Sequence, residues 1–433
     1  MRVFLGLTEI AGYYRGLHRG LREIGVESVY ACGGHHFAYA EEEEQSAWPV
    51  RLFRRLSFLR LATPRPGKVK RAVLKVAHWC SKVPLLFWAL GKCDVFVFGY
   101  GSCFFSTREL WLFRLLGKRT IHVFHGSDNR PCYMDGTVVQ PERMQDADAV
   151  IRHHRRQHAL VKLIERYSDC LVSHPATGQY FDKPYVNWLL ATGLPFAGET
   201  SDGCVPAGNS EGSVVILHCP SDPAAKGTDL IRGVIRSLQA KGHVIDYREL
   251  MNRPNSEVLR QLRECDFVMD QAFADYPMAG FATEAAHFGK PAVVGGYARE
   301  ICAAIGIRNG MPCAAFCRPE EMEELTERMI TDTVFRQECG RRAKEFVSTA
   351  WSRRNIAQNW LRLLRNDIPA DWKVAPAQID YTGGAGLDVE GLRRGVTWFL
   401  QHGGEESLFM NHRPDLKAQM LALAGSEHQA FRS

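Results

Sequence analysis

Short apolar runs that end at a glycine or a polar residue recur along the whole chain. Runs of this length and composition are typical of buried strands in a parallel sheet. Segments with helical spacing of apolar residues separate them, and strands that alternate with helices predict an α/β fold. The predicted strands lie at 2–7, 29–32, 94–98, 119–124, 169–173, 213–217, 267–269, 291–294 and near 314–316.

The alternation of strands and helices starts over in the second half of the chain, after a segment from 196 to 212 that is rich in Gly, Ser, Asp and Pro. Such a composition marks a linker, and 433 residues are enough for two domains with separate cores. We therefore predict two Rossmann-like domains, at 1–196 and 213–350, that face a cleft. A C-terminal extension at 375–433 has no assigned role.

A nucleotide-shaped site is indicated between the strands at 267–269 and 291–294. Gly280 leads into a predicted helix that Thr283 would cap at its start. The unpaired N–H groups and the dipole of such a helix start favour an anion, and Glu284 could then accept hydrogen bonds from the hydroxyls of a ribose. In the alternative, Glu284 only complements the helix dipole and the glycines only serve packing.

The segment from Gly280 to Val294, GFATEAAHFGKPAVV, resembles the donor-site motif of retaining glycosyltransferases of family 4. In a subset of that family the preceding strand ends in Asp-Gln, as Asp270 and Gln271 do here. The chain departs from the wider pattern at Tyr276, where many members carry a second glutamate. We therefore expect Glu284 to be the single acidic ligand of the donor.

A second polar loop, His125-Gly-Ser-Asp128-Asn-Arg130, follows the strand predicted at 119–124. It lies at the sheet edge where open α/β proteins bind ligands. Histidine can move a proton, aspartate can orient a hydroxyl and arginine can hold a phosphate. In the alternative, Asp128 and Arg130 pair with each other in a buried turn. The order His-Gly-Ser-Asp-x-Arg also resembles the same glycosyltransferase subset, which implies site roles for all three residues.

A third candidate loop precedes a helix in the second domain and contains Lys226 and Gly227. A lysine there can reach a diphosphate as a point charge, although an exposed lysine at a turn is the simpler alternative. The loop resembles the donor-phosphate loop of family 4, in which an arginine or serine precedes the lysine, and here that residue is Ser221. Gly12, at the first strand-to-helix turn, would let a substrate approach the backbone closely.

The resemblance covers roughly residues 1–365 and implies the GT-B architecture, with a helix at 351–374 that returns to the first domain. It implies sugar transfer from a nucleotide-sugar co-substrate to an acceptor hydroxyl, with retention. We also expect no metal and no other cofactor, because fixed donors in a closed cleft can stabilise the leaving diphosphate. His125 and Glu284 are the predicted catalytic residues, and Asp128 and Arg130 are predicted to contact the acceptor or a phosphate. The predicted donor-binding residues are Gly12, Ser221, Lys226, Gly227, Gln271, Gly280, Phe281, Ala282, Thr283 and Glu284.

The net charge of +6 is informative mainly because basic residues are concentrated in one segment. Residues 51–92 hold eleven basic and no acidic side chains. Apolar and aromatic residues at helical spacing lie between them. This pattern suits an anionic membrane surface, where each nearby Lys or Arg adds about 1 kcal/mol. A solvated helix with a packed underside and a nucleic-acid groove are the alternatives. The apolar run at 83–90 is too short to span a bilayer, so we expect peripheral membrane contact and no nucleic acid.

Composition narrows the protein class further. With 45% hydrophobic and 24% charged residues, the chain has the composition of a soluble globular protein. Its thirteen scattered cysteines and the absence of a signal-peptide pattern predict reduced thiols in the cytoplasm. We expect Cys313 and Cys317 to be structural, and His153, His154 and His158 to form a solvated helix face rather than a metal site.

The expected role is therefore synthesis of cell-surface polysaccharide or glycolipid, with a glycan or lipid-linked acceptor, at the inner face of the membrane. Three other classes stay open. A GT-B-like epimerase or phosphorylase would use a similar pocket. A non-catalytic scaffold is compatible with Tyr276 and the unusual extension. A nucleic-acid-binding protein would explain the basic segment but would leave the nucleotide-shaped loops unexplained.

Overall fold

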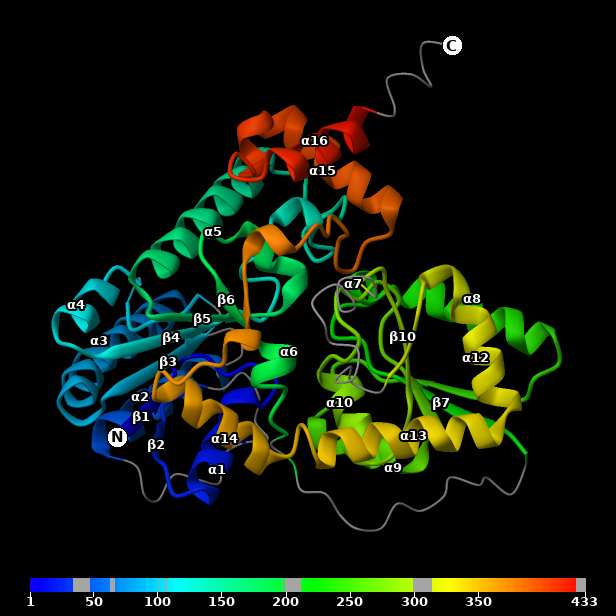
Figure 1. The fold of residues 1–433 in the computed structure, drawn as a ribbon, viewed down its shortest axis with the longest axis horizontal. Helices are drawn as coiled ribbons and strands as arrows, with labels where there is room; N and C mark the ends of the chain where they lie inside the picture. The colour runs from blue at the N-terminus through cyan, green and yellow to red at the C-terminus, as the bar shows by residue number, and fades with distance from the viewer. Residues whose placement is uncertain are drawn as a thin grey trace.

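The computed structural model describes residues 1–33, 47–62, 67–99, 101–105, 107–196, 198, 212–298 and 314–425. Two sheets of mainly parallel strands lie side by side, with helices on their faces (Figure 1). The predicted α/β class with two Rossmann-like sheets is confirmed. Most of the predicted linker and Cys313 lie outside the described residues, so the predicted domain boundaries at 196 and 213 stay predictions.

The first sheet has seven strands in the order β12-β6-β5-β4-β3-β1-β2. Its central strands are buried on both faces because helices cover them, which is why the sequence shows continuous apolar runs there. The strands are β1 (Arg2–Leu5), β2 (Glu27–Tyr30), β3 (Val95–Gly99), β4 (Arg119–Val123), β5 (Cys170–Ser173), β6 (Tyr185–Asn187) and β12 (Lys373–Val374). The helices between them are α1 (Tyr13–Glu23), α2 (Trp48–Ala62), α3 (Lys68–Lys92), α4 (Leu110–Leu115), η2 (Cys132–Met134), α5 (Ala147–Tyr167), η3 (Pro175–Tyr180) and α6 (Trp188–Ala191).

The second sheet has five parallel strands in the order β11-β10-β9-β7-β8. The edge strand β8 (Ile245–Glu249, IDYRE) was missed by the sequence analysis because it is only half-buried and carries charged side chains. The other strands are β7 (Val214–His218), β9 (Phe267–Met269), β10 (Ala292–Gly295) and β11 (Ala315–Cys317). The helices are α7 (Pro223–Lys226), α8 (Thr228–Ala240), α9 (Asn255–Glu264), α10 (Gly280–His287), η4 (Pro319–Glu321), α12 (Met322–Thr331) and α13 (Thr333–Ser348).

After α13 the chain returns to the first sheet. Helix α14 (Arg353–Leu364) packs so closely on α1 that a Cβ at Gly20 would lie 2.8 Å from the carbonyl oxygen of Arg353. The guanidinium of Arg353 also pairs with Glu23 at 2.8 Å. Beyond η5 (Ala370–Trp372), strand β12 pairs antiparallel with β6. The first sheet is therefore completed by residues from the far end of the chain.

The C-terminal extension packs against α5 and η2 of the first domain (Figure 1). His154 on α5 is buried beneath it, with Nε2 2.7 Å from the carbonyl oxygen of Ser407 and its ring against Phe399. The expectation that His154 lies on a solvated face is therefore wrong, because the extension covers that face of α5. The extension comprises η6 (Pro376–Gln378), α15 (Val389–Gly403), η7 (Glu405–Leu408) and α16 (Pro414–Gly425).

A short segment of the extension contacts both domains. The amide of Gly136 donates to the carbonyl oxygen of Ala385 at 2.8 Å. The amide of Ala385 donates to the carbonyl oxygen of Met134 at 3.0 Å. The next amide, of Gly386, donates to the carbonyl oxygen of Phe273 in the second domain at 2.8 Å. Residues 385–386 therefore tie the two domains together through main-chain hydrogen bonds.

We expect Gly386→Ala to destabilise the protein more than Gly117→Ala does. Both glycines have a positive φ, 71° and 63°, so both substitutions add backbone strain of about 1–2 kcal/mol. A Cβ at Gly386 would also lie 2.5 Å from the carbonyl oxygen of Ala225, whereas a Cβ at Gly117 meets nothing within 4 Å. Overpacking should therefore cost Gly386→Ala roughly a further 1–3 kcal/mol in urea unfolding. Equal losses would contradict the close contact.

Candidate functional site

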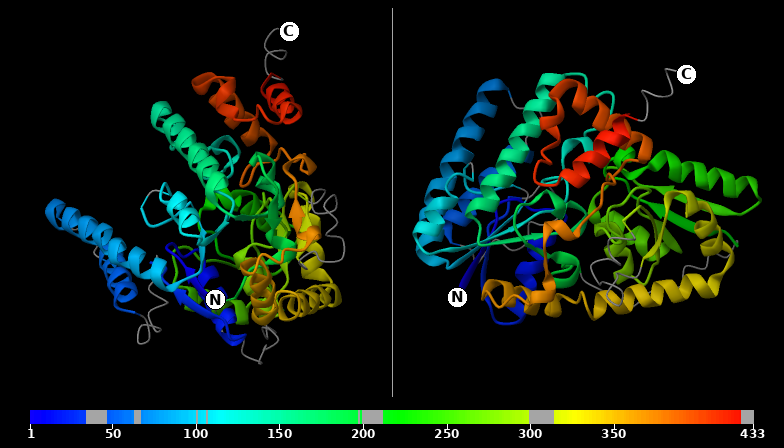
Figure 2. Two further views of the ribbon diagram at one scale, coloured as in Figure 1. Left: turned by 60° about the vertical axis from the view of Figure 1, so that its left-hand side comes forward. Right: turned by 45° about the horizontal axis from the view of Figure 1, so that its top comes forward.

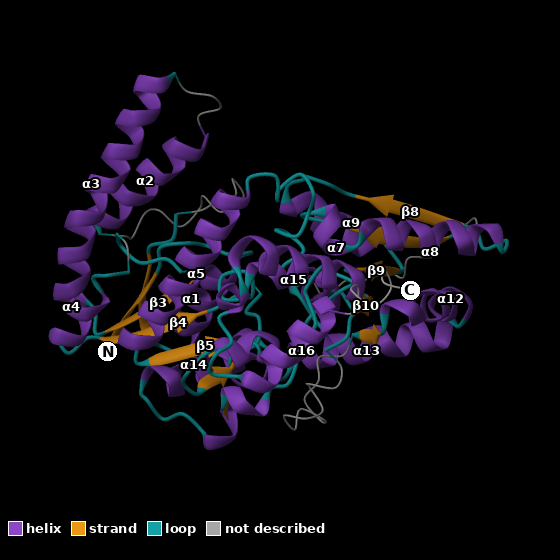
Figure 3. Cartoon of the chain, turned by 90° about the horizontal axis from the view of Figure 1, so that it is seen from above, coloured by secondary structure: helices purple, strands orange, loops and turns teal. Residues whose placement is uncertain are grey.

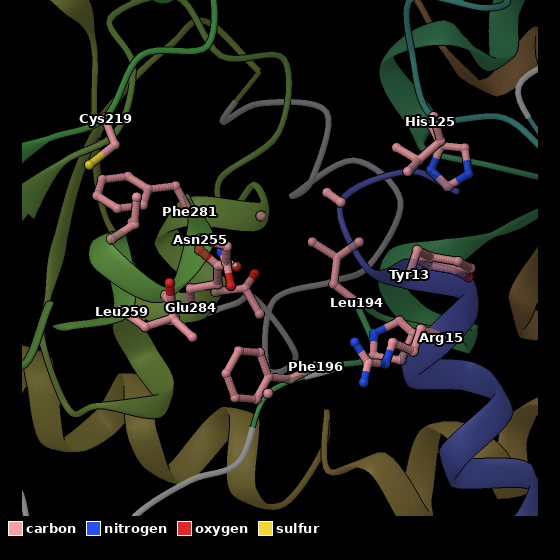
Figure 4. A pocket seen from close by; sticks show the side chains of 18 of the residues that line it. Tyr13, Arg15, His125, Leu194, Phe196, Cys219, Asn255, Leu259, Phe281 and Glu284 are labelled. Atoms are coloured by element: carbon pink, nitrogen blue, oxygen red, sulfur yellow. Dashed lines mark hydrogen bonds between the residues drawn. The ribbon is translucent and has the colours of Figure 1, made fainter. Parts of the chain in front are cut away.

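A cavity of about 550 Å³ lies between the two domains (Figure 4). This volume is in the range of small-molecule sites. In Figure 4, Glu284, Asn255 and Phe281 lie on one side of it, and His125 and Arg15 on the other. The first domain contributes Ile10, Ala11, Tyr13, Arg15, Arg19, His125, Leu194, Pro195 and Phe196. The second domain contributes Cys219, Arg253, Asn255, Ser256, Val258, Leu259, Tyr276, Gly280, Phe281, Thr283 and Glu284.

The start of α10 forms part of the cavity wall. The helix begins at Gly280, after Ala279 in extended conformation, and it has neither a side-chain cap nor an acidic residue in its first turn. The predicted cap, Thr283, lies one turn inside the helix, where its hydroxyl donates to the carbonyl oxygen of Ala279 at 2.8 Å. The prediction of a Thr283 cap is therefore wrong, because the helix starts earlier than expected. Its uncapped N–H groups suit an anionic ligand.

Glu284 supplies a carboxyl group beside this helix start. Its Oε1 accepts a hydrogen bond of 3.0 Å from the side-chain amide of Asn255, at the start of α9. Burial, with a smaller contribution from the nearby Asp270, raises the pKa of Glu284 to about 7 against the opposing effect of the Asn255 hydrogen bond. Near neutral pH this carboxyl can therefore either accept or donate a hydrogen bond. No local pattern in the sequence indicates Asn255 as the partner of Glu284.

On the opposite wall, His125 lies next to a tyrosine of α1. The Tyr14 hydroxyl is 3.0 Å from His125 Nε2. This contact requires a glycine at position 99, because a Cβ there would overlap the Tyr14 hydroxyl. Burial, together with the nearby His174, lowers the pKa of His125 to about 4. The imidazole is therefore neutral at physiological pH and can exchange hydrogen bonds with a hydroxyl.

Asp128 organises the loop that holds His125. Its Oδ1 accepts hydrogen bonds from the backbone amides of His125 and Gly126, at 2.8 and 2.9 Å. Burial raises the pKa of Asp128 to about 7, and these amides and Arg130 oppose the rise. Asp128 does not line the cavity. In this structure Asp128 holds the backbone at His125 and Gly126 in place without reaching the cavity.

Arg130 connects the two domains. Its guanidinium pairs with Asp135 of its own domain at 3.3 Å and with Asp275 of the second domain. The side chains of Arg130 and Asp275 are only 8% and 4% exposed, and His174 Nε2 is 3.5 Å from the same Asp275 carboxylate. The Arg130 guanidinium, with a smaller contribution from His174, keeps the pKa of Asp275 below its usual range despite burial. The alternative pairing of Arg130 with Asp128 is wrong, because Asp275 and Asp135 take the guanidinium.

Tyr276 follows Asp275 directly and lines the cavity. Its ring packs against His174 and, edge to face, against Trp188, with ring centroids 5.1 and 5.5 Å away. Both partners belong to the first domain. The residue at which the chain departs from the family 4 pattern therefore fills the domain junction with an aromatic ring.

Other predicted donor residues do not line this cavity. The Lys226 ammonium is 3.2 Å from Asp270 Oδ1 and 2.9 Å from Gln271 Oε1, at the carboxyl end of β9. Gly227 has a φ of 65° and forms the turn between α7 and α8, where a Cβ would lie 2.6 Å from that of Ala272. Ser221 and Ala282 are also absent from the cavity wall. Their roles in donor binding stay predictions.

The start of α1 differs from that of α10 because it is already occupied. The Glu9 carboxylate accepts hydrogen bonds from the amides of Ile10, Tyr14 and Arg15 and from the Tyr30 hydroxyl, at 2.7–3.2 Å. Gly12, with a φ of 79°, forms the turn before this helix and does not line the cavity, although its neighbours do. An anion at this helix start would have to displace Glu9.

Three arginines of the cavity wall were not among the site residues predicted from the sequence. Arg15 and Arg19 lie four residues apart on α1, so they share one helix face. Arg253 precedes α9 on the opposite wall. Among the described residues that line the cavity, Glu284 is the one carboxylate. The spacing of Arg15 and Arg19 was the available signal, and the positive wall suits a phosphate.

The chain matches no protein-family model, and no curated protein matches it. Similar solved structures include the glycosyltransferase SnogD from Streptomyces nogalater, with 16% identity over 84% of this chain and 99% of that one and a TM-score of 0.40. Anabaena HepE in complex with UDP-glucose has 12% identity over 84% of this chain and 99% of that one, with a TM-score of 0.43. A TarM complex from S. aureus that contains UDP has 11% identity over 66% of this chain and 59% of that one, with a TM-score of 0.42. TM-scores this low carry no argument about this chain.

We expect Glu284→Gln to change how stability depends on pH. Because the pKa of Glu284 is raised from 4.5 to about 7, the stability given by its protonated form is complete below pH 4.5 and is lost as the pH rises through 7. Glutamine cannot ionise, so the stability of the variant lacks this pH dependence. Between pH 4.5 and 8 the unfolding free energy of the variant, relative to that of wild type, should therefore rise by roughly 3 kcal/mol. Urea unfolding at both pH values measures this gain. A constant difference between Glu284→Gln and wild type across this pH range would contradict the raised pKa of Glu284.

We expect Asp275→Asn to lower the unfolding free energy by about 3–5 kcal/mol, because it leaves the buried Arg130 short of one carboxylate. Arg130→Met should also destabilise, since it leaves two buried carboxylates without their cation. The double variant should lose less than the sum of the two, because it removes Arg130 and Asp275 together and leaves only Asp135 without its cation. Urea unfolding of the three variants measures the coupling. Strict additivity would show that this pair does not join the domains.

Proposed function

We propose that this protein transfers a sugar from a nucleotide-sugar donor to an acceptor hydroxyl. One observation carries the proposal: the uncapped start of α10 and the carboxyl of Glu284 line the same cavity. The helix start suits a diphosphate, and a carboxyl held by Asn255 suits the hydroxyls of the adjoining ribose. The resemblance of 125–130, 218–229 and 270–294 to retaining glycosyltransferases of family 4 supports the same chemistry, including retention.

The chemical difficulty of this reaction is the charge that develops on the leaving diphosphate. The bond between the sugar and the phosphate oxygen breaks, the bond between the sugar and the acceptor oxygen forms, and the hydroxyl proton passes to the diphosphate. The fixed N–H donors of α10 would stabilise that diphosphate, and Arg15 and Arg19 add positive charge to the cavity wall. This stabilisation requires no metal ion.

His125 would hold the acceptor. A pKa of about 4 makes its imidazole a weak base, so its proposed role is to orient the acceptor hydroxyl rather than to remove its proton. A donor role for Lys226 requires its side chain, which is 19% exposed, to turn from Asp270 and Gln271 towards the donor. The proposed acceptor is a glycan or a lipid-linked sugar in cell-surface polysaccharide or glycolipid synthesis.

A second candidate function is nucleotide binding without turnover. One observation favours it: the aromatic ring of Tyr276 fills the position at which many members of the resembled family carry a second glutamate. Such a protein would bind the nucleotide at Glu284 as an enzyme would, and only a turnover measurement separates the two functions.

We expect one nucleoside diphosphate among UDP, GDP and ADP to stabilise the protein selectively in a thermal-shift measurement. Binding to the folded state alone at a hundred times the Kd contributes about 2.7 kcal/mol. Glu284→Ala should abolish most of this stabilisation, and Glu257→Ala should preserve it. The matching nucleotide sugar should then be consumed by the wild type in the presence of EDTA.

The two candidate functions give different results in this experiment. Binding of a nucleotide without any consumption of its sugar conjugates, with or without added Mg²⁺, would favour the second candidate. Absence of stabilisation by every nucleotide would overturn both.

A further inference from the structure

Helices α2 and α3 form a hairpin that projects from the first domain (Figures 2 and 3). Its inner face is packed: Phe53, Ser57, His78 and Leu85 are buried, and His78 Nε2 lies 3.0 Å from the Ser57 hydroxyl oxygen. No described residue of the hairpin lines the cavity. The hairpin therefore has a stable inner contact and an outer face that the cavity does not use.

The outer face of α3 carries an apolar stripe along most of its length. The members of the stripe recur at alternating intervals of four and three residues, so they lie on one side of the helix. They are exposed even though their side chains are apolar. The stripe consists of Val69 (79% exposed), Val73 (60%), Val76 (61%), Cys80, Val83 (37%) and Phe87 (71%).

Basic side chains accompany this stripe. Lys68, Lys75 and Lys82 recur every seven residues and therefore follow one border of it. In the described part of the hairpin, α2 carries four arginines and α3 carries six basic residues. Neither helix carries an acidic residue there. Trp79, which is 55% exposed, lies between the stripe and this lysine row and contacts the ring of Phe105.

Helix α4, which lies beside the end of α3 (Figures 1 and 3), also carries exposed apolar side chains. Trp111, Leu115 and Leu116 are exposed there by 53%, 71% and 49%. Large exposed apolar patches rimmed by charge mark interaction sites. The position of the patch at the end of one domain leaves the cavity and the second domain uncovered.

Charge decides between two occupants of this surface. A stripe with four and three spacing fits a second helix, as in a coiled coil, but a second copy of this chain would bring together two hairpins that lack acidic residues. An anionic bilayer attracts each nearby Lys or Arg by about 1 kcal/mol and also takes up the apolar side chains. No helix in the described part of the chain is long and apolar enough to cross a membrane, so α3 would lie within the plane of the interface.

We propose that the outer face of the α2–α3 hairpin docks on an anionic lipid surface, with the stripe at the level of the acyl chains and the lysine row at the head groups. The proposal does not depend on sugar transfer, because it uses none of the cavity residues. If both hold, the cavity is carried to an acceptor presented by the membrane.

Sedimentation of the full chain with vesicles tests this. The wild type should bind vesicles of phosphatidylcholine with 30% phosphatidylglycerol, and should bind pure phosphatidylcholine at least roughly tenfold more weakly. Binding should weaken as salt rises, since the lysines act through screened charge. Val73→Asp/Val76→Asp and Lys68→Glu/Lys75→Glu should each reduce binding by roughly tenfold or more.

The control is Val334→Asp on α13, an equally exposed apolar position (78%) in the second domain, which should bind as wild type does. All substituted positions are exposed, so circular dichroism should show unchanged folding. Failure of the wild type to bind anionic vesicles overturns the proposal, as does equal binding to both vesicle types. A wild-type dimer in gel filtration that Val73→Asp/Val76→Asp dissociates would identify a second copy as the occupant instead.

Discussion

The arrangement of the two domains depends on one buried charge, the guanidinium of Arg130 between Asp135 and Asp275. A charge removed from water must be paired, and here its partners belong to different domains. His125 lies just before Arg130 and Tyr276 just after Asp275, so the ion pair also sets the distance between the two cavity walls. Main-chain hydrogen bonds of Ala385 and Gly386 reinforce the same junction from the C-terminal extension.

The two helix starts near the cavity differ in what occupies them. At α1 the chain satisfies the free amides with its own carboxylate, Glu9, whereas at α10 no side chain does so. An anion is therefore favoured on the second domain's wall, with Arg15 and Arg19 facing it from the first. Burial raises the pKa of Glu284 to about 7 and lowers the pKa of His125 to about 4. His125 is therefore uncharged at neutral pH, and the carboxyl of Glu284 is close to half-ionised.

Two separate surfaces follow from this architecture. The cavity uses polar groups from both domains and requires them to stay joined. The outer face of α3 belongs to the first domain alone and uses apolar and basic side chains that no described part of the protein covers. A ligand between the domains and a partner on the hairpin can therefore be bound at the same time.

The sequence by itself determined the α/β class, the central strands and the glycine, helix and glutamate of α10, because burial and periodicity are local properties of the chain. It also marked the basic and apolar face of α3. Only the tertiary structure decided the partner of Arg130, which is 145 residues away, the burial of His154 beneath the extension, and the half-exposed edge strand β8. Such features depend on which distant segments pack together, and a local pattern of residues does not indicate which distant segment will be the partner.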